Sequence, residues 1–535
     1  MFANLRRRMR NPLFLLGMAA GLIAFVVQSG DVDSADTARR LQTTHSFWTL
    51  APPVLPGDYP EFGLRGRGGK IYAWYGIGQS LLMLPADMVG TALEKLPIFR
   101  DYNGNDPSVR NIVVSYSTNI LVNVLTALVC FRFLTLLKFT VQQAVAGVLA
   151  LLVCTTHLHY TQNMMENNYI LLLTLAGFTY QYEWLLTGAR RALVLGSAAF
   201  GLNLLTRLTV AMDVFAGGVF LLLVLLLRGE RGTAVWARLR TYAAVAFPIY
   251  AVFLLVDRLY QYYRFGSFLN TYMTVFGEQQ RMLNPSLPAN YPFETPFHVG
   301  FLGALFTPEK SIFLFDPLLI LTVLVLAVGW RRFAPEMKAF LITSFLLLLM
   351  YISFYARYTV WSGDSAWGDR YVASAAQLAA FISVPLLLRY REQAGRVLWR
   401  MGVSLIAASA VVQIASVAFW LSLEIYQMTT LGHPTFVVWL RFKNIVAFAL
   451  GKMNAWGLTN DDMTTDPWDY VHITTWNFLP FVLRRVGEAP HWVMRVAFAV
   501  WIAGLGSLAW VLRELVSSLQ EKLVVSRQSS VVSKN

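Results

Sequence analysis

Long apolar stretches joined by short connections dominate the sequence and restrict what the chain can fold into. We expect membrane-spanning helices at 12–27, 111–136, 142–157, 168–186, 192–206, 211–227, 242–257, 312–329, 339–355, 371–388, 401–421 and 491–512. A helix that crosses the hydrocarbon core, which is about 30 Å thick, needs roughly 20 mostly apolar residues. Composition agrees, because 56% of the 535 residues are hydrophobic and 14% are charged, whereas about 25% are charged in an average soluble domain. We therefore predict an all-α polytopic membrane protein with about twelve transmembrane helices.

The formal net charge of +14 raises the question of a nucleic-acid partner. A nucleic-acid binder carries its basic residues on one face of a soluble domain, and the sequence contains no stretch that predicts such a domain. The Lys and Arg residues stand instead between apolar stretches, as in the cytoplasmic loops of membrane proteins. We expect no nucleic-acid partner. Cys130 and Cys154 lie inside apolar stretches, so they predict neither a disulfide framework nor a metal cluster.

The segment 72–93 decides the predicted topology, because it is apolar enough to span but contains Gly76, Gly78, Pro85 and Asp87. If it does not cross the membrane, the N-terminus and five basic connections are all cytoplasmic. Together these carry 18 Lys or Arg against three Asp or Glu, which satisfies the positive-inside rule. If the segment crosses, every later connection changes side and the rule fails. We therefore predict that 72–93 is an interfacial helix at the outer surface.

The same reasoning places the N-terminus in the cytoplasm. We expect the first apolar run to be a retained helix, because the residues after it make a poor cleavage site for a signal peptide. The predicted location is a cytoplasmic (inner) membrane, which the protein crosses many times.

Three long segments, 29–110, 258–311 and 422–490, then face the extracytoplasmic side. They mix charges of both signs with aromatic residues and prolines, as functional loops do, whereas the cytoplasmic connections are short and basic. We divide the chain into a transmembrane module at 1–421, an outer loop or small domain at 422–490, and a last helix with a cytoplasmic tail at 491–535. The large first outer loop, 29–110, belongs to the transmembrane module.

Three aspartates, Asp31, Asp33 and Asp36, follow the first apolar run directly. A carboxylate at this depth has a low-dielectric environment on one side and water on the other, and partial desolvation raises its pKa toward that of a general base. Alternatively, Asp33 or Ser34 caps a helix that starts near Ala35, with Asp36 in its first turn. Capping would explain Asp33 and Asp36 but leaves Asp31 unexplained, so Asp31 is our first candidate catalytic residue.

His157, His159 and Glu166 form a second polar group, which we expect in a short outward loop. His-x-His with Glu offers three ligands and is compatible with a divalent metal. The alternative is a hydrogen-bonded polar loop in which the two histidines orient a substrate. Glu166 begins a predicted membrane helix and must therefore face protein or a cavity, so we add it to the candidate catalytic residues.

Three cations, Lys70, Arg207 and Arg370, stand on the predicted outer side and break the positive-inside pattern. A cation on that side beside acidic residues is expected to be paired or to bind a ligand, and guanidinium groups suit the phosphate of a lipid.

Aromatic residues lie near these cations along the chain, namely Tyr72, Tyr75, Trp361 and Trp367. We take them as candidate substrate-orienting residues. The alternative is interfacial anchoring, to which Trp and Tyr side chains contribute in most membrane proteins.

In this order the motifs resemble those of the GT-C glycosyltransferases that use polyprenyl-phosphate sugars, a family that includes protein O-mannosyltransferases and the aminoarabinose transferases of lipid A. The resemblance covers roughly the first 390 residues. It is carried by Ser29-Gly30-Asp31 after the first helix, by the stretch 69–80 followed by Leu84-Pro85, by Glu166, by the stretch 205–209, and by the stretch 361–371.

The resemblance implies an inverting transfer on the extracytoplasmic face. An aspartate of the first loop would deprotonate an acceptor hydroxyl that attacks the anomeric carbon of a lipid-phosphate sugar. Motif position favours Asp31 as the base and Asp33 second. The family often has an adjacent Asp-Glu pair, whereas here Val32 separates the two aspartates, which leaves the choice of base open.

Lys70, Arg207 and Arg370 would offset the charge of the leaving phosphate. The expected partners are a polyprenyl-phosphate-sugar donor, a glycan, lipid or protein acceptor, and the bilayer. No cofactor is required, and a divalent metal stays open.

A transporter or flippase for lipid-linked glycans is the main alternative. Transporters place ionisable and helix-breaking residues near the bilayer midplane in repeated halves. Here the predicted spans carry almost no charge in their middle parts, and acids and cations gather at their outer ends. A non-catalytic assembly protein is a third class, but it does not predict an aspartate beside an interfacial helix. The pattern therefore favours a glycosyltransferase.

Overall fold

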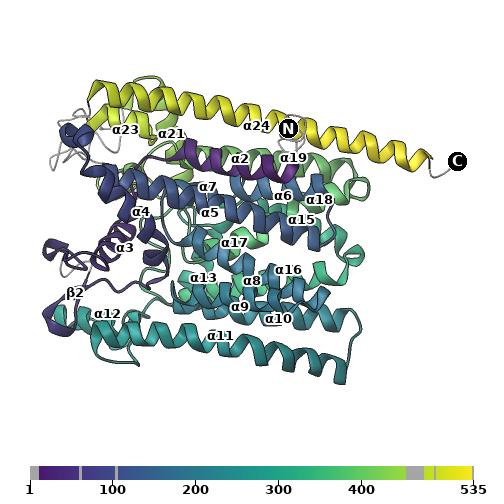
Figure 1. Cartoon of the computed structure of the whole chain (residues 1–535), viewed down its shortest axis with the longest axis horizontal. Coiled ribbons are helices and arrows are strands. Elements are labelled where there is room, and N and C mark those ends of the chain that lie inside the picture. Colours follow the sequence, from purple (N-terminus) through teal and green to yellow (C-terminus); the bar gives the residue numbers. More distant parts are fainter. Residues whose placement is uncertain (1–10, 59–62, 103–106, 454–474, 487–489, 533–535) are drawn as a thin grey trace.

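The computed structural model describes residues 11–58, 63–102, 107–453, 475–486 and 490–532. Within these ranges the chain is a bundle of helices with one two-stranded sheet, in which β1 (Leu64–Arg65) pairs antiparallel with β2 (Ile71–Tyr72). Most long helices run along the same axis of the molecule (Figure 1). The prediction of an all-α architecture is confirmed.

Helices lie at every stretch for which the sequence predicted a span. They are α2 (Pro12–Val27), α5 (Val109–Leu136), α6 (Val141–Val153), α8 (Asn167–Thr187), α9 (Arg190–Leu204), α10 (Ala211–Leu227), α11 (Thr233–Phe265), α14 (Ile312–Phe315) with α15 (Leu318–Gly329), α16 (Pro335–Tyr355), α17 (Ala373–Ala380) with α18 (Ser383–Arg389), α19 (Arg391–Ser416) and α24 (His491–Val532). Over the described residues, six helices are long and apolar enough by length and composition to cross a membrane: α5, α10 with the turn before it, α11, α16, α19 and α24. The polytopic character is therefore confirmed, while α2 and α6 are shorter apolar helices.

Local sequence signals explain where several helices begin and end. The Ser108 side chain accepts a hydrogen bond from the backbone N–H of Asn111 (3.1 Å) at the start of α5. Thr140 and Gln143 form a capping box at the start of α6, in which each side chain satisfies a free N–H group of the first turn. Gly188, at φ 73°, ends α8 in the left-handed conformation that glycine adopts without strain.

The core of the bundle surrounds α8, nearly all of whose residues are buried. This helix packs against α5, α9, α10 and α17. Small residues allow close approach: a Cβ on Gly177 of α8 would lie 2.5 Å from the ring of Phe200 on α9. The end of α8 that begins with Asn167 is therefore held rigidly by its neighbours.

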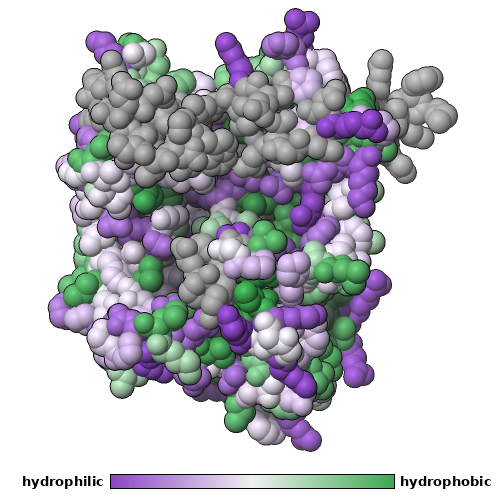
Figure 2. Space-filling view, turned by 90° about the vertical axis from the view of Figure 1, so that its left-hand side faces the viewer, coloured by the Kyte–Doolittle hydropathy of each residue, from purple (hydrophilic) through white to green (hydrophobic). Residues whose placement is uncertain are grey.

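The long predicted outer segments meet at one end of the bundle. They contain α3 (Ala35–Ser46), α4 (Gly78–Glu94), α12 (Tyr272–Leu283), α13 (Phe297–Phe306), α20 (Ser422–Thr429), α21 (Val437–Ala449) and α23 (Leu479–Val486). Figure 1 shows α3, α4, α12, α21 and α23 gathered at its left-hand end, which we call the loop end. Figure 2 faces this end and shows hydrophilic and hydrophobic residues intermingled over it. Parts of the predicted 422–490 segment lie outside the described residues.

Basic connections meet at the opposite end. A guanidinium nitrogen of Arg389 donates to the backbone carbonyl of Lys138, and Arg228 forms an ion pair with Glu336 at 3.6 Å. The first contact joins the α18–α19 connection to the α5–α6 connection, and the second joins the α10–α11 connection to the start of α16. The charge pattern had assigned these connections to one side of the membrane. Which side of the membrane each end faces stays a prediction, and the basic residues at 1–10 lie outside the described residues.

The predicted interfacial helix at 72–93 is wrong in its first six residues, because α4 begins at Gly78. The chain before it is extended: Tyr72 pairs with Leu64 in the sheet. The guanidinium of Arg264, at the end of α11, then binds the backbone carbonyls of Ala73 and Tyr75, the latter at 3.0 Å. A buried cation from a distant helix thus holds this stretch away from helical geometry.

Asp87 of α4, which the sequence marked as an unusual residue in an apolar stretch, is fully buried and saturated with donors. It accepts hydrogen bonds from Trp48 (2.7 Å) and Arg110, and His45 lies 3.0 Å away. This cluster joins α4 to α3 and α5. The polar residue therefore fastens α4 to the bundle.

Candidate functional site

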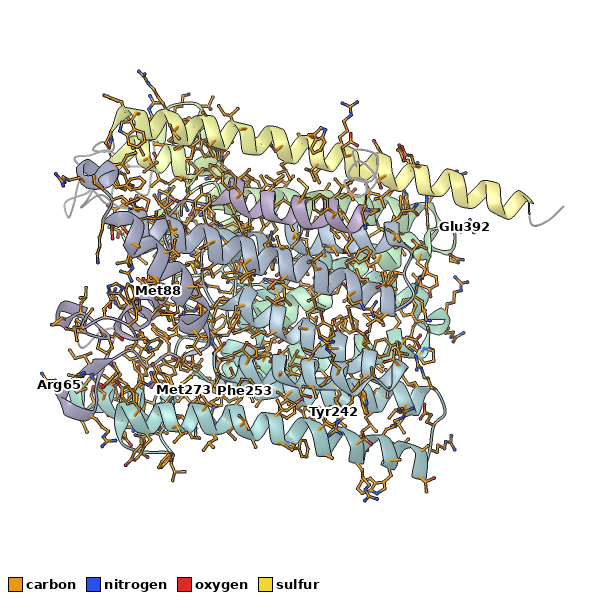
Figure 3. All side chains as sticks on the ribbon, in the orientation of Figure 1. Arg65, Met88, Tyr242, Phe253, Met273 and Glu392 are labelled. Carbon is orange, nitrogen blue, oxygen red and sulfur yellow. The ribbon has the colours of Figure 1, made fainter. Side chains whose placement is uncertain are left out.

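A cavity of about 370 Å³ lies at the loop end of the bundle. Its walls come from α3, the stretch 74–76, Glu166, the stretch 204–209, α11, the start of α12 and the stretch 355–371. Met273 of α12, one of the lining residues, lies toward the end that carries Arg65 in Figure 3, whereas Tyr242 of α11 lies toward the other end. Seven parts of the sequence thus meet around one space.

Five charged side chains converge on this cavity: Asp36, Arg40, Glu166, Arg207 and Arg370. Arg370 Nη1 lies 2.6 Å from Asp36 Oδ2, and Arg40 Nη1 lies 2.7 Å from Glu166 Oε2. Arg207 forms a second ion pair with Glu166. All five side chains are less than a fifth exposed. Three guanidinium groups face two carboxylates here, so this inner cluster has one positive charge in excess.

Two further acids line the cavity but take no part in the ion pairs of this inner cluster. Asp257 of α11 is ion-paired with its neighbour Arg258, and Asp364 is an exposed residue. An uncompensated charge away from water is costly, so the inner cluster favours an anionic ligand that would complete it.

The arginines keep both inner carboxyl groups ionised. Burial by itself raises the pKa of Asp36, but Arg370 and then Arg40 outweigh it and hold that pKa below its usual value. For Glu166, burial is likewise outweighed by Arg207 and Arg40, which lower the pKa to about 2. Tyr75 donates a hydrogen bond to Asp36 Oδ1 (2.5 Å), and burial raises the pKa of its phenol, so it stays a donor.

Aromatic rings fix the planes of the guanidinium groups. Arg207 and Arg370 lie over the ring of Tyr371, at 5.2 Å and 5.3 Å from its centre, and Arg40 lies 4.2 Å over Tyr75. Tyr371 in turn stacks on Tyr355, with ring centres 4.3 Å apart. Such cation–π contacts favour one orientation of each guanidinium and leave its N–H groups directed sideways.

Helix α3 presents Asp36 and Arg40 together because residues four apart share one helix face. The chain reaches α3 through a sharp bend in which Gly30 has φ 91° and Asp33 has φ 51°. The hydroxyl of Thr37 then donates to the carbonyl of Met164 (2.7 Å), which ties α3 to the stretch that carries Glu166. The two halves of the charge cluster are thus fastened to each other.

Four of the residues singled out in the sequence line the cavity: Tyr75, Glu166, Arg207 and Arg370. They come from four separate stretches of the chain, and the fold brings them together with Asp36. Their roles in binding or catalysis stay predictions.

Asp31 and Asp33 do not line the cavity. Asp31 Oδ1 accepts hydrogen bonds from the backbone of Val32 (2.6 Å) and from Asn111 (3.3 Å). Asp33 is buried, and its Oδ2 accepts from Ser29 (2.8 Å) and Asn477 (3.4 Å). Both carboxylates stabilise the bend before α3. Their catalytic role stays a prediction. Of the three aspartates, Asp36 is the one that lines the cavity.

Lys70 and Tyr72 also lie away from the cavity. Lys70 is exposed next to the β1–β2 hairpin. Tyr72 is buried against Tyr263 and Phe265, with ring centres about 6.0 Å and 6.1 Å away. The β1–β2 hairpin thus keeps both side chains out of the cavity wall.

His157 and His159 lie in a short buried helix, α7 (His157–Gln162), and not in the outward loop that the sequence suggested. His157 Nε2 bonds the amide oxygen of Asn123 (2.8 Å), and His159 Nδ1 lies 3.3 Å from the carbonyl of Ser416. Burial, with Arg441 nearby, lowers the pKa of the His159 imidazole to about 3. The loop prediction was wrong because α7 packs between α6, α8 and α19.

The two histidines do not join Glu166 in a ligand set. Among the described residues, no group of three or more His, Cys, Asp and Glu side chains is arranged to hold a metal ion.

Neither predicted tryptophan lines the cavity. Trp361 packs closely on α13, where a Cβ on Gly303 would lie 2.2 Å from its ring. Trp367 is fully buried, stacked on His159 with ring centres 5.7 Å apart. Both residues lock the 355–371 stretch against neighbouring helices.

Several cavity residues were missed by sequence reasoning. Asp36 was grouped with Asp31 and Asp33 but was not kept as a candidate catalytic residue, because a place in the first turn of a helix also explains it. Arg40 was not singled out, although a cation on an outer helix breaks the positive-inside pattern as Arg207 does. For Tyr272, Tyr358 and Tyr371 the sequence offers no comparable signal, because tyrosines are common at membrane interfaces.

The sequence matches no protein-family model and no curated protein. Among solved structures, it is similar to ArnT from Cupriavidus metallidurans bound to undecaprenyl phosphate. The similarity has 13% sequence identity and a TM-score of 0.40, and it covers 94% of this chain and 77% of that chain. A similarity of this extent says nothing about substrate or site residues.

Proposed function

We propose that this protein is a membrane glycosyltransferase that moves a sugar from a polyprenyl-phosphate donor to an acceptor hydroxyl, with inversion at the anomeric carbon. The observation that carries the proposal is the inner charge cluster, in which three arginines meet two carboxylates beside an open cavity at the end of an apolar bundle. The arginines of the cluster suit an anionic group of the donor, and its aspartate offers a carboxylate that can accept a proton.

Arg207 and Arg370 are the proposed phosphate ligands. Both guanidinium groups lie over the same Tyr371 ring, so they flank a common space, and neither is fully buried. Charge-assisted hydrogen bonds from guanidinium groups suit phosphate oxygens. Their contribution grows as negative charge develops on the leaving phosphate. Lys70, which the sequence added to this set, is not part of the cavity wall.

Asp36 is the proposed base. The acceptor oxygen would attack the anomeric carbon from the side opposite the phosphate, its proton would pass to the Asp36 carboxylate, and the bond to the phosphate oxygen would break with its electron pair going to the phosphate. In this structure, Arg370 holds Asp36 as a weak base. A phosphate that binds Arg370 weakens this ion pair and raises the pKa of Asp36, which makes it a better proton acceptor.

The position of the cavity fits a lipid-linked donor. It lies at the loop end, opposite the basic connections, and the positive-inside rule assigns that end to the extracytoplasmic side of a cytoplasmic membrane. About 370 Å³ accommodates a sugar phosphate, while a polyprenyl chain would stay in the bilayer. A glycan, a lipid or a protein can supply the acceptor hydroxyl in this scheme, and no cofactor takes part.

The test is transfer of radiolabelled sugar from a panel of polyprenyl-phosphate sugars to membrane extracts by the purified protein. Wild type is compared with Asp31→Asn, Asp33→Asn and Asp36→Asn. Transfer that is lost in Asp36→Asn and kept in Asp31→Asn supports the proposal. Loss in Asp31→Asn alone would move the base to that residue. No transfer from any donor would contradict the enzyme and would favour a lipid-linked glycan transporter or flippase, which a flipping assay in vesicles would detect.

A further inference from the structure

The segment between Gly363 and Arg370 carries Arg370 into the cavity without any regular secondary structure. Gly363, Asp364 and Gly368 have φ values of 77°, 56° and 71°, so the backbone takes the left-handed conformation at each of them. The loop is folded tightly: a Cβ on Gly363 would lie 2.8 Å from the side chain of Arg370. Such a loop depends on outside contacts to keep one conformation.

Buried side chains supply those contacts by binding the carbonyl groups of the loop. Lys310 Nζ donates hydrogen bonds to the carbonyls of residues 364 (2.6 Å), 366 (2.9 Å) and 368 (3.4 Å). The hydroxyl of Tyr160 donates to the carbonyl of residue 367 (3.0 Å), and the amide of Asn167 donates to that of Arg370. Three of these five bonds come from Lys310, whose ammonium has three N–H donors to give.

Lys310 itself is 1% exposed, and no ion pair to it is found among the described residues. Burying an ammonium without a paired carboxylate is costly, and here the dipoles of three carbonyls offset that cost. Burial lowers the pKa of Lys310 to about 8, while Glu309, Asp369 and Asp364 favour its charged form and Arg370 opposes it. A fold that only needed an apolar plug at this position would do better with methionine or leucine.

The backbone around Lys310 is held in place by hydrogen bonds. Lys310 lies in the turn between α13 and α14, where the backbone N–H groups of Lys310 (3.2 Å) and Ser311 (2.8 Å) both donate to the carbonyl of Thr307. The Ser311 hydroxyl also donates to the carbonyl of Leu305 (2.6 Å). A rigid turn thus presents the ammonium to a loop that is itself irregular.

We propose that Lys310 is a positioning residue, which holds the 364–370 loop so that Arg370 lies in the cavity and can bind a phosphate. The part of this inference that names phosphate rests on the proposed function, whereas the part that concerns the loop does not. Lys310 acts through Arg370 and does not touch the ligand.

The first experiment measures backbone hydrogen exchange by mass spectrometry in Lys310→Met, which removes the three donors at similar side-chain length. Peptides that cover 363–371 are expected to exchange at least tenfold faster than in wild type, with peptides of α16 unchanged. Lys338→Met, at the opposite end of the bundle, is the matched control and should leave the loop unchanged. Equal exchange of the loop in Lys310→Met and wild type would overturn the inference, whether or not any phosphate binds.

The second experiment measures binding of a polyprenyl phosphate without sugar to the purified protein. Lys310→Met is expected to weaken binding about tenfold in the wild-type background and less than twofold in an Arg370→Gln background, because residues that act as one unit give non-additive effects. The same loss in both backgrounds would mean that Lys310 only stabilises the fold, and would overturn its positioning role. Lys310→Arg, which keeps charge and donors, should recover part of the affinity.

Two variants guard against a failure to fold. If Lys310→Met does not give a monodisperse protein, Lys310→Gln enters the same cycle with two donors retained, and Tyr160→Phe removes one carbonyl bond of the same loop. Both are expected to speed exchange at 363–371, and no change in either would overturn the inference. Absence of polyprenyl-phosphate binding in wild type would count against the proposed function and would leave the exchange result to decide the role of Lys310.

Discussion

Two carboxylates, Asp36 on helix α3 and Asp87 packed against that helix, have opposite surroundings. Asp87 accepts hydrogen bonds from Arg110 and Trp48 and lies 3.0 Å from His45. Its side chain is fully buried and does not line the cavity. Asp36 faces a cavity and belongs to a cluster in which cations outnumber carboxylates. A saturated carboxylate holds elements together, whereas a cluster with an excess of charge beside open space is prepared for a ligand.

The largest effect is expected on activity at Asp36. Asp36→Asn keeps the shape of the side chain but removes the proton acceptor, and general-base catalysis contributes about 10²- to 10⁴-fold. We expect the turnover rate to fall by about 10²-fold or more, with the unfolding temperature nearly unchanged. Initial rates of sugar transfer measure the first quantity and thermal unfolding in detergent the second. A rate within about threefold of wild type would remove Asp36 from the mechanism.

Asp87 should show the opposite behaviour. Asp87→Ala leaves Arg110 without its buried partner, and breaking such a pair costs about 3 kcal/mol. We expect a clearly lower unfolding temperature, while the activity of each folded molecule stays close to that of wild type. The comparison requires active-site titration or a binding count to correct for the unfolded fraction. If the specific activity of Asp87→Ala falls as far as that of Asp36→Asn, the distinction between the two clusters is wrong.

Arg207 and Arg370 should affect binding of the donor. Hydrogen bonds to charged groups contribute about 1.5–3 kcal/mol, so Arg207→Gln and Arg370→Gln are each expected to weaken binding of a polyprenyl phosphate by about 10- to 150-fold. The exposed Lys70→Gln is the matched control and should bind like wild type. Calorimetric titration of the purified variants measures these constants. Unchanged affinity in both arginine variants would place the phosphate elsewhere.

Glu166 should make stability depend on acid pH. Its pKa in the folded protein is lowered to about 2 from an ordinary value near 4.5. A lowered folded-state pKa contributes stability that is fully present above the unfolded value and is lost as the pH falls through the folded one. We therefore expect the unfolding temperature of wild type to drop between pH 4.5 and pH 2, and that of Glu166→Gln to drop less over the same range. Parallel curves for the two proteins would contradict the ion pairs drawn here.

The smallest effect is expected at Tyr75. Tyr75→Phe removes one hydrogen bond to Asp36 and keeps the ring beneath Arg40. A hydrogen bond to a charged group contributes about 1.5–3 kcal/mol. We expect the lower end of that range here, about tenfold in the transfer rate, because Arg370 stays paired with Asp36. A larger loss in initial rate would mean that the phenol takes part in proton transfer.

The helices were predictable from the sequence because apolar length and basic connections are local properties of the chain. Each predicted span contains one helix, or two in the case of 312–329 and 371–388, and the long segments meet at one end. Glu166, Arg207 and Arg370 were also predictable, since charged residues at helix ends on the less basic side have to be paired or bound.

The rest depended on contacts between distant residues. Asp36 lines the cavity and Asp31 does not, because the chain bends before α3. In this bend Asp33 has a positive φ although it is not a glycine, and no sequence pattern predicts that. Lys310 stands in a segment predicted to be an exposed loop, yet it is buried beneath a second loop 54 residues away. The extended chain before α4 follows from Arg264, which lies 191 residues beyond Ala73. Packing between such distant segments determines all three.

In the proposed mechanism, a lipid phosphate binds between Arg207 and Arg370 and releases Asp36. A structure of the protein in lipid nanodiscs with a polyprenyl phosphate would show this directly. We predict phosphate density in contact with both guanidinium groups and a longer distance between Arg370 and Asp36 than the 2.6 Å in the present structure. Phosphate bound outside the cavity, or an Arg370–Asp36 ion pair that persists beside it, would contradict the account.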